Sequence, residues 1–583
     1  MTPKIRAAAG LAMLVGLGLP FAHGAGAANG GKARLPAKAA DCGAADAGIT
    51  LPPGFCATVF ADGLGHARHM AVAPDGTLYV NTWSGRYYRN APPPPEAGFM
   101  VALRDTDGDG RADRIERFGP SPAKGGTGGT GIALFGSGLY AEAGADVVRY
   151  ALAPGRIAPA GPPEVVVSGL PLEGDHPMHP FVIDRTGALF LNSGSATNAC
   201  QPANRKPGIS GADPCTELET RAGLWRYDAK ARDQRFSPAG RYATGIRNTG
   251  GLAFDGAGRL LAVQHGRDQL SQNWPAHFST QAGVELPAEE LVVVKAGADY
   301  GWPRCYYDPA RHALMLAPEY GGDGKAVGAC ATKTPPVAAF PAHWAPNDLM
   351  IYAGSSFPTA YRGGAFIAFH GSWNRAPAPQ DGYNIVFQPM RDGRAVGHYI
   401  VFANGFAGAF EEPGRARFRP AGLAQAPDGA LYIADDREGR IWRITYRGSI
   451  GAGLVPARNA RAAPAATADD IAPERLALPP GTTAKQVALG RAIFLGKARG
   501  GTCGGCHGSD ARGTSVGPDL TTKSGLWTDG SIVSIARIIR EGVPNPKRFP
   551  GAMPARGGAD LSAADVDALA AYLVQLQNGK PAL

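Results

Sequence analysis

Apolar and polar residues alternate along most of this chain with the two-residue period of half-buried β-strands. The clearest copy spans residues 70–80, where two apolar runs flank Pro74-Asp75-Gly76. Glycine in such a turn supplies the positive φ that a tight hairpin needs, and the alternation buries one face of each strand. We therefore expect a β-hairpin here. Before residue 447 the sequence shows no convincing long amphipathic helix.

The hairpin pattern recurs at irregular spacing as far as residue 433. Three more clear copies and two weaker ones are found at residues 181–191, 251–261 and 422–433, and at residues 131–140 and 364–369. Repeated hairpins that cannot cover their own faces are typical of β-propeller blades. We predict an all-β, six-bladed β-propeller over residues 41–446, with long loops inserted between repeats. A pair of β-sandwiches is the structural alternative.

The pattern changes after residue 446. Residues 447–482 are rich in Ala and Pro and predict a linker of moderate stiffness. In residues 483–583 apolar positions repeat at helical spacing, after Thr483 as a cap and after the capping box of Ser562 and Asp565. These positions are Val487, Gly490 and Phe494, and then Val566, Leu569, Leu573 and Leu576. We expect a small all-α domain at residues 483–583.

The C-x-x-C-H motif at residues 503–507 predicts a covalently attached haem c. The thiols of Cys503 and Cys506 can add to the two vinyl groups of one porphyrin, and His507 can then ligate the iron. Met553 is the one Met after residue 466, which makes it the candidate for the second axial ligand. Loose packing in a Pro/Gly-rich loop is the alternative for Met553. A thioether opposite imidazole raises the reduction potential, which suits an electron acceptor.

Length and cysteine content place these segments in a secreted, multidomain protein. With 583 residues the chain should form two or three domains. Lys4 and Arg6 precede an apolar run and small residues, so residues 1–27 are predicted to be a signal peptide; a membrane anchor is the alternative. No other stretch is long enough to span a bilayer stably. With covalent haem attachment, this points to the periplasm.

Six of the eight cysteines remain once two are assigned to haem. In an oxidising compartment an even remainder suggests three disulfides. Nearest-neighbour pairing is the simplest of the possible connectivities, and the others stay open: Cys42–Cys56, Cys200–Cys215 and Cys305–Cys330. The net charge of +9 is spread through the chain without a basic stripe, so nucleic-acid binding is unsupported.

Residues 105–116 satisfy a complete calcium-loop pattern. The carboxylates at alternate positions can converge on one ion, Gly110 allows the sharp turn, and the last residue can close the shell. The candidate ligand positions are Asp105, Asp107, Asp109, Arg111 and Glu116. We expect calcium to act here as a structural clamp. A solvated acidic turn is the alternative.

Polar and aromatic clusters lie at the ends of the expected hairpins, where one mouth of a propeller would be. They occur at residues 175–180, 245–254, 265–268, 300–303, 370–375 and 415–419. Together they resemble the soluble pyrroloquinoline-quinone (PQQ) sugar dehydrogenases, most closely the L-sorbosone and pyranose dehydrogenase branch, over roughly residues 41–445. The strongest matches are the R-N-x-x-G-L-A-F, Y-G-W-P, H-G-S-W-N-R and R-x-R stretches. The last hundred or so residues resemble class I cytochromes c, through Gly490, Phe494, Tyr572 and the loop 517–520.

The resemblance implies PQQ and a calcium ion in the propeller mouth, and it implies roles by position. His176 matches the base that takes the sugar hydroxyl proton. The positions matched to PQQ or its calcium are Arg247 and Asn248 at the reactive face, the carbonyls of Gly266 and Arg267 on calcium, and Arg417 and Arg419 at the carboxylates. Three more residues are assigned to the cofactor pocket: Trp373, His265 where the family has a glutamine, and Arg375 for a family lysine that has no clear match in this sequence. Where the glucose enzyme has an acidic partner for its base, this chain has Ser195, and Asp175 is a possible substitute.

These features predict a periplasmic quinohaemoprotein that oxidises a sugar hydroxyl or hydrated aldehyde by hydride transfer to PQQ. Electrons would pass to the haem and then to an external cytochrome, blue-copper protein or respiratory oxidase. Two rivals remain: a calcium-dependent lactonase, and a binding propeller that presents the cytochrome to a partner.

Overall fold

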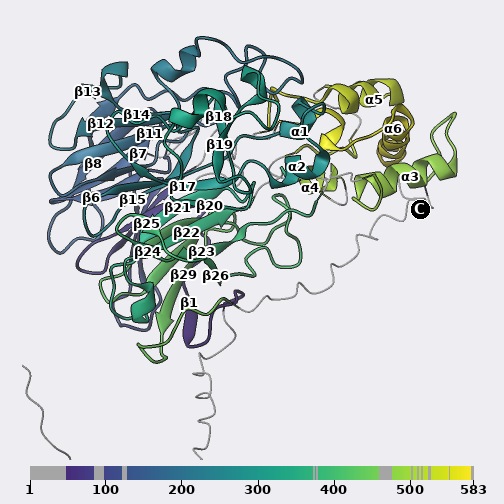
Figure 1. Ribbon diagram of the computed structural model, residues 1–583. Coiled ribbons are helices and arrows are strands. Elements are labelled where there is room, and N and C mark those ends of the chain that lie inside the picture. Colours follow the sequence, from purple (N-terminus) through teal and green to yellow (C-terminus); the bar gives the residue numbers. More distant parts are fainter. Residues whose placement is uncertain are drawn as a thin grey trace, which may run out of the picture. The chain divides into compact units, whose positions relative to one another are not determined.

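The computed structural model describes most of the chain between residues 47 and 578 (Figure 1). The described ranges are 47–83, 98–120, 128–159, 161–371, 374–375, 378–457, 476–499, 503–508, 511, 513, 517–522, 527–549 and 552–578. The predicted signal peptide and the middle of the predicted linker lie outside them. Among these residues no helix combines the length and the hydropathy needed to cross a membrane.

Six antiparallel sheets form the blades of a propeller, each starting with its innermost strand. Blade 1 contains β2 (Ala67–Val72), β3 (Leu78–Thr82), β4 (Met100–Arg104) and β5 (Arg114–Phe118). Blade 2 contains β6 (Ile132–Phe135), β7 (Gly138–Ala143), β8 (Asp146–Ala151) and β9 (Glu164–Ser168), with β13 (Gln234–Arg235) added parallel to β9. Blade 3 contains β10 (Phe181–Ile183), β11 (Ala188–Ser193), β12 (Gly223–Asp228) and β14 (Arg241–Thr244).

The second half of the propeller repeats this plan. Blade 4 contains β15 (Thr249–Phe254), β16 (Leu260–Gln264), β17 (Glu289–Val294) and β20 (Ala338–Phe340). Blade 5 contains β21 (Pro346–Ile351), β22 (Ala365–His370), β23 (Tyr383–Gln388) and β26 (Ile400–Ala403). Blade 6 contains β27 (Pro420–Gln425), β28 (Leu431–Asp435), β29 (Ile441–Tyr446) and β1 (Phe55–Ala61). Small hairpins and helices decorate the loops: β18 (Cys305–Asp308) with β19 (Ala313–Leu316), β24 (Met390–Arg391) with β25 (Arg394–Ala395), α1 (Leu270–Asn273) and α2 (Thr280–Glu285).

The inner strands of the six blades contact one another in a closed ring, in the order β2, β6, β10, β15, β21, β27 and back to β2. The six-bladed propeller predicted from the repeats is therefore confirmed. The plainest predicted hairpin, β2–β3, turns at Asp75-Gly76, where Gly76 has a φ of +86° and the Asp75 carboxylate accepts a hydrogen bond from Thr77 N. The weak copy at residues 364–369 contains β22 alone, because its hairpin partner β21 lies before a long connection.

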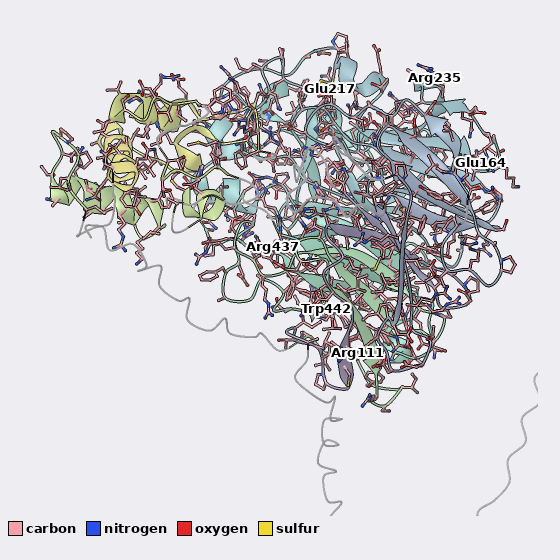
Figure 2. The ribbon with its side chains drawn as sticks, turned by 180° about the vertical axis from the view of Figure 1, so that it is seen from behind. Arg111, Glu164, Glu217, Arg235, Arg437 and Trp442 are labelled. Atoms are coloured by element: carbon pink, nitrogen blue, oxygen red, sulfur yellow. A yellow bond between two sulfur atoms is a disulfide. The ribbon has the colours of Figure 1, made fainter. Side chains whose placement is uncertain are left out.

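The ring is closed by its first strand, since β1 pairs antiparallel with β29 from the other end of the propeller. Phe55 of β1 packs against the rings of Phe357 and Phe402, with centroids 4.8 and 4.9 Å away. Trp442 of β29, labelled in Figure 2, is fully buried. Its ring makes edge-on contacts with the rings of Phe406 and Phe418. Blade 6 is thus held by an aromatic core that both ends of the propeller share.

The C-terminal residues form the expected small helical domain. Its helices are α3 (Ala484–Phe494), α4 (Cys503–His507), α5 (Ile532–Glu541), the 3-10 helix η7 (Ala555–Gly558) and α6 (Ala563–Asn578). Thr483 caps α3 by accepting from Gln486 N, and Ser562 and Asp565 form the predicted capping box of α6. Gly490 permits the crossing of α3 and α6, because a Cβ there would lie 2.0 Å from the Ala568 carbonyl oxygen.

Two of the three nearest-neighbour disulfides are present, Cys200–Cys215 and Cys305–Cys330. Cys56 is also disulfide-bonded, and its predicted partner Cys42 lies outside the described residues. Cys503 and Cys506 are not part of a disulfide, in agreement with their assignment to haem attachment.

Candidate active site and haem site

A cavity at one mouth of the propeller is lined by residues from two kinds of place. Some lie at the start of the inner strands or in the loops just before them, and others lie in the connections between the second and third strands of blades 3, 4 and 5 or at the strand ends beside them. Each blade hairpin delivers such residues to the same end because the blades repeat with the same direction. The propeller residues among them with ionisable or amide side chains are Arg68, Asp175, His176, Asn204, Arg205, Arg247, Asn248, His265, Asp268, Glu289, His343, Asn347, His370, Asn374 and Arg419. The sequence therefore predicted His176, Arg247, Asn248, His265 and Arg419 as neighbours, and the structure brings them together.

The imidazole of His176 is held in one tautomer. Its Nδ1 lies 2.8 Å from the Ser195 carbonyl oxygen and 3.1 Å from the Ser195 hydroxyl, which itself donates to the Thr197 carbonyl. A carbonyl can only accept, so Nδ1 carries the proton and Nε2 keeps a free lone pair. Burial, reinforced by the charge of Arg247, lowers the pKa of His176 to about 3. The imidazole is therefore neutral and available as a base at ordinary pH.

Asp175 has a different set of partners. Its carboxylate accepts hydrogen bonds from Asn204 Nδ2 and from the guanidinium of Arg205. The contact of His176 Nδ1 goes to Ser195, so the structure favours Ser195 over Asp175 as the group that orients the base.

Asp268 links two buried arginines at the centre of this wall. Its Oδ2 lies 2.9 Å from Arg205 Nη2 and 3.1 Å from Arg247 Nη2, and Asn374 donates to its Oδ1. Burial alone would favour the neutral acid, but Arg247 and Arg205 lower the pKa of Asp268 below its ordinary value. The carboxylate thus stays charged and fixes both guanidinium groups beside the cavity.

A second ion-pair group lies where blade 1 meets blade 6. Arg68 is ion-paired with Asp436, and His370 Nε2 lies 2.8 Å from the other oxygen of that carboxylate. Arg419 differs from the other arginines, because its guanidinium donates to the carbonyls of His370 and Gly371 and forms no ion pair with any described residue. Because both of its hydrogen-bond partners are neutral carbonyls, its positive charge suits an anionic group in the cavity.

The chain between Gly266 and Glu289 provides oxygen atoms at the cavity wall. The Gly266 carbonyl accepts from Arg247 Nη1 at 2.9 Å, which leaves one lone pair for a cation. The Glu289 carboxyl accepts from Gly266 N and Ala345 N, and burial raises its pKa to about 8. His265 donates to the Pro346 carbonyl, and burial, followed by the charge of Arg247, lowers its pKa to about 4.

Other predicted cofactor residues lie elsewhere. Arg417 is exposed and stacks over the ring of Phe418, and it does not line the cavity. Arg375 donates to the carbonyls of Pro379 and Ala342 and also lies away from the lining. The Arg267 side chain is ion-paired with Glu319, and the assignment of its backbone carbonyl to calcium stays a prediction. Trp373 lies outside the described residues.

The acidic loop of blade 1 brings together three of its predicted ligands. Carboxylate oxygens of Asp105, Asp107 and Asp109 lie within 4.8 Å of one another. Arg111 donates its backbone N–H to Asp109. Glu116 is not part of the group: it lies on β5 and pairs with Arg114. The calcium loop therefore remains a prediction that rests on three carboxylates.

The haem motif lies on α4, within the helical domain. His507 is buried, and its Nδ1 lies 2.9 Å from the Pro518 carbonyl, which leaves Nε2 free for iron. Gly517 permits this close packing, because a Cβ there would lie 2.7 Å from the Cys506 carbonyl oxygen and 3.2 Å from His507 Nδ1. Cys503 and Met553 pack against the same hydrophobic core. The backbone of Met553 both donates a hydrogen bond to the backbone of Val543 and accepts one from it. These residues fit a covalent haem with a His–Met axial pair.

Residues 49–447 match the family model described as TrAA12-like. The chain belongs to this family. Residues 486–573 match the model described as cytochrome C oxidase, cbb3-type, subunit III. The fusion of a propeller of the PQQ sugar dehydrogenase type with a cytochrome c domain, predicted above, is thereby confirmed.

Solved structures show the same propeller fold. The holo form of the pyranose dehydrogenase PQQ domain from Coprinopsis cinerea is 19% identical, with a TM-score of 0.53, and covers 68% of this chain and 97% of that one. A calcium structure of carbohydrate-active enzymes family AA12 from Trichoderma reesei is 20% identical, with a TM-score of 0.51 and the same coverage. A curated relative, an uncharacterized protein from Borreliella burgdorferi, is 29% identical over 208 residues, which span 35% of this TrAA12-like chain and 48% of the relative.

Sequence reasoning missed Arg68, Arg205 and Glu289 of the cavity lining, and it gave no role to Asp268, although the cluster at residues 265–268 contains it. One signal was available for Arg68, which lies at the start of the first inner strand, much as Arg247-Asn248 precedes the fourth. Asp268 directly follows the matched Gly266-Arg267 pair and could have been included with it.

Proposed function

We propose that this TrAA12-like protein is a periplasmic sugar dehydrogenase that uses PQQ and calcium in the propeller mouth and haem c in the C-terminal domain. The observation that carries the proposal is His176, a buried neutral base of fixed tautomer, in a cavity that four arginines also line. PQQ is a tricarboxylate, so forked guanidinium groups are the partners it needs. When bound, PQQ supplies a two-electron acceptor and haem c a one-electron carrier.

Each of the cavity residues would have a distinct role in the proposed oxidation. His176 Nε2 would take the proton of the sugar hydroxyl, and Ser195 would hold the ring and stabilise the proton on Nδ1. Arg247, fixed by Asp268 and Asn198, would stabilise negative charge on an oxygen beside it. Arg419 would neutralise a cofactor carboxylate, and the Gly266 carbonyl would contribute to the calcium site.

The residues of the C-terminal domain fit the second redox group. Cys503 and Cys506 would attach the haem, and His507 and Met553 would ligate its iron. An external cytochrome, blue-copper protein or respiratory oxidase would accept the electrons. The disulfides at Cys200–Cys215 and Cys305–Cys330 support an oxidising compartment.

Dye reduction by the purified full-length protein tests this function. A panel of aldoses, ketoaldoses and small alcohols would be offered with PQQ and calcium together, with each alone and with neither. We expect sugar-dependent reduction when both are present. Hydrolysis of lactones without the quinone would instead identify a lactonase. A protein that reduces no dye with any substrate, although it binds PQQ, would be a binding module.

A further inference from the structure

The tetrapeptide Ser195–Asn198, which we name the base turn, connects the two central groups of the cavity. On one side the Ser195 carbonyl holds His176 Nδ1, and the Ala196 carbonyl accepts from the backbone N–H of Asp175 next to it. On the other side the Asn198 side chain accepts from Arg247 Nη2 at 3.0 Å and its carbonyl accepts from Arg247 Nε at 3.2 Å. The positions of the base and of the arginine therefore depend on one short loop.

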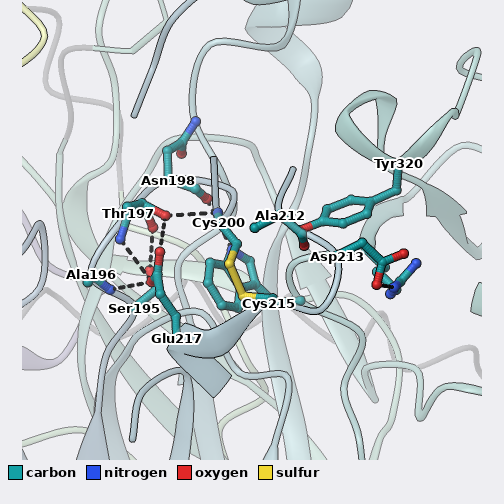
Figure 3. The surroundings of a disulfide bond; sticks show 12 residues. Ser195, Ala196, Thr197, Asn198, Cys200, Ala212, Asp213, Cys215, Glu217 and Tyr320 are labelled. Carbon is teal, nitrogen blue, oxygen red and sulfur yellow. Dashed lines mark hydrogen bonds and ion pairs between the residues drawn. A yellow bond between two sulfur atoms is a disulfide. The ribbon is translucent and has the colours of Figure 1, made fainter. Parts of the chain in front are cut away.

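Glu217 holds this turn from behind. Its Oε2 accepts from Ala196 N at 2.8 Å and from Thr197 N at 3.1 Å, and its Oε1 accepts from the Thr197 hydroxyl (Figure 3). Thr197 Oγ1 in turn accepts from Cys200 N at 2.8 Å. A single carboxylate thus satisfies two consecutive backbone donors and one hydroxyl, an arrangement that neutral side chains cannot reproduce, because each carries fewer acceptor sites.

The Cys200–Cys215 disulfide fixes the carboxylate relative to the turn. Glu217 lies on the 3-10 helix η1 (Thr216–Glu219), which starts directly after Cys215, while Cys200 follows the base turn (Figure 3). The disulfide therefore joins the element that carries the acceptor to the segment that carries the donors. Neither the turn nor η1 belongs to a blade strand, so the framework of blade 3 does not position them by itself.

We propose that Glu217 is a positioning residue of the active site: through the base turn it sets the tautomer and location of His176 and the orientation of Arg247. This inference rests on the proposed function for its kinetic consequences. The structural part stands independently, because it concerns the imidazole and the guanidinium of the protein without cofactor.

Glu217→Gln is the test variant, and Glu219→Gln is its matched control on the same 3-10 helix with an exposed side chain. The amide would present an N–H₂ group to donors of the turn and so release part of it. At saturating PQQ, calcium and sugar we expect kcat to fall by about tenfold to a hundredfold in Glu217→Gln, as small misplacements of catalytic groups do. Glu219→Gln should keep the wild-type kcat.

Two measurements separate positioning from a general loss of structure. In wild-type protein labelled with ¹⁵N-histidine, and without any cofactor, the His176 signals should report the Nδ1–H form, assigned by their absence in His176→Ala. Glu217→Gln should convert them to a tautomer mixture. The acid limb of kcat/KM against pH should also move to higher pH in the variant, since water admitted by a looser turn raises the low pKa of His176, which faces Arg247, Asp175 and His265.

An unchanged tautomer together with an unchanged acid limb in Glu217→Gln would overturn the proposal, even if melting temperature and kcat fell. If Glu217→Gln does not fold, Thr197→Val carries the same test. It removes the hydroxyl that donates to Glu217 and accepts from Cys200 N, and it leaves the two backbone donors of the turn in place. A wild-type protein that shows the Nδ1–H form but oxidises no sugar would refute the proposed function and leave the positioning intact.

Discussion

At the scale of single residues, the chemistry depends on which lone pairs and charges stay available once the hydrogen bonds and ion pairs within the protein have formed. His176 Nδ1 donates a hydrogen bond to the Ser195 carbonyl, and the lone pair of Nε2 stays available. In the same way, His507 Nδ1 donates a hydrogen bond to the Pro518 carbonyl. In both cases a backbone carbonyl selects the tautomer, so the ring is fixed before a substrate or an iron atom reaches it.

Replacing His176 with Ala should lower the rate of sugar-dependent haem reduction by about a hundredfold or more, because the hydroxyl proton then has no acceptor. The haem absorption spectrum should stay unchanged. Stopped-flow absorbance at the haem band measures both, with His398→Ala, an exposed histidine, as the control. Retained turnover would remove His176 from this role.

Replacing Met553 with Ala should have the converse effect. Loss of the thioether should change the visible haem spectrum and lower the reduction potential, while dye-linked sugar oxidation persists. Spectroscopy and redox titration test this, with Met390→Ala in the propeller as the matched control. An unaltered spectrum would mean that iron takes another axial ligand.

Sequence predicted the site residues that belong to recognisable motifs and missed those that topology brings in. His176 and Arg247 could be named because each sits in a matched stretch. Arg205 could not, since it reaches the cavity through a loop whose path depends on the Cys200–Cys215 disulfide and on Asp175. Arg417 shows the opposite error: its R-x-R motif suggested a ligand, but only Arg419 of that pair lines the cavity.

At the scale of elements, hairpins and helices follow local sequence closely where turn and cap residues are explicit. The Asp-Gly turn of β2–β3 and the capping box of α6 are of this kind. The β21–β22 hairpin was only half visible, because residues 352–364 separate its strands and no tight turn marks it. Strand pairing across a long connection depends on contacts with the neighbouring blades, and the local sequence pattern holds no information about those contacts.

Gly490→Ala should destabilise the cytochrome domain by about 1–3 kcal/mol, since a Cβ would press on the Ala568 carbonyl and push α3 from α6. Thermal unfolding followed at the haem band measures the effect. Ala488→Leu, on the exposed face of the same helix, should change little. Equal stability of the two variants would contradict this account of the crossing.

Calcium added without PQQ should raise the melting temperature of the propeller if the 105–116 loop binds it, since an ion bound only to the folded state stabilises that state. Asp107→Asn should reduce the shift by removing one of three converging carboxylates. Asp146→Asn serves as the control. The same shift in both variants would assign the stabilisation to another site.

At the scale of the molecule, the fold joins a rigid ring to a small helical domain. The ring has no free inner edge, because its six inner strands meet in a circle and β1 completes the last blade. Such closure gives the loops at the mouth a common, fixed support. The motif residues that these loops carry can therefore converge although they are far apart in sequence.

Phe55→Ala should lower the free energy of unfolding of the propeller by about 3–5 kcal/mol, because the ring of Phe55 packs against several aromatic side chains of blades 5 and 6. Denaturant unfolding followed by tryptophan fluorescence should show the loss as a lower midpoint concentration. The midpoint measured at the haem band should be the same as in the wild type. Thr58→Ala, a half-buried change in the same strand, is the control. Parallel loss of both signals would mean that the two domains unfold as one unit.

The pairing of β1 with β29 also constrains the order of events during synthesis. β1 is synthesised before every other blade strand, yet its partner is complete only when residues 441–446 have been made. Until then the first strand has no sheet to join, and the contacts that complete the ring span nearly the full propeller in sequence, which makes them slow to form. The segment that attaches haem, α4, comes later still in the chain, after β29 and α3.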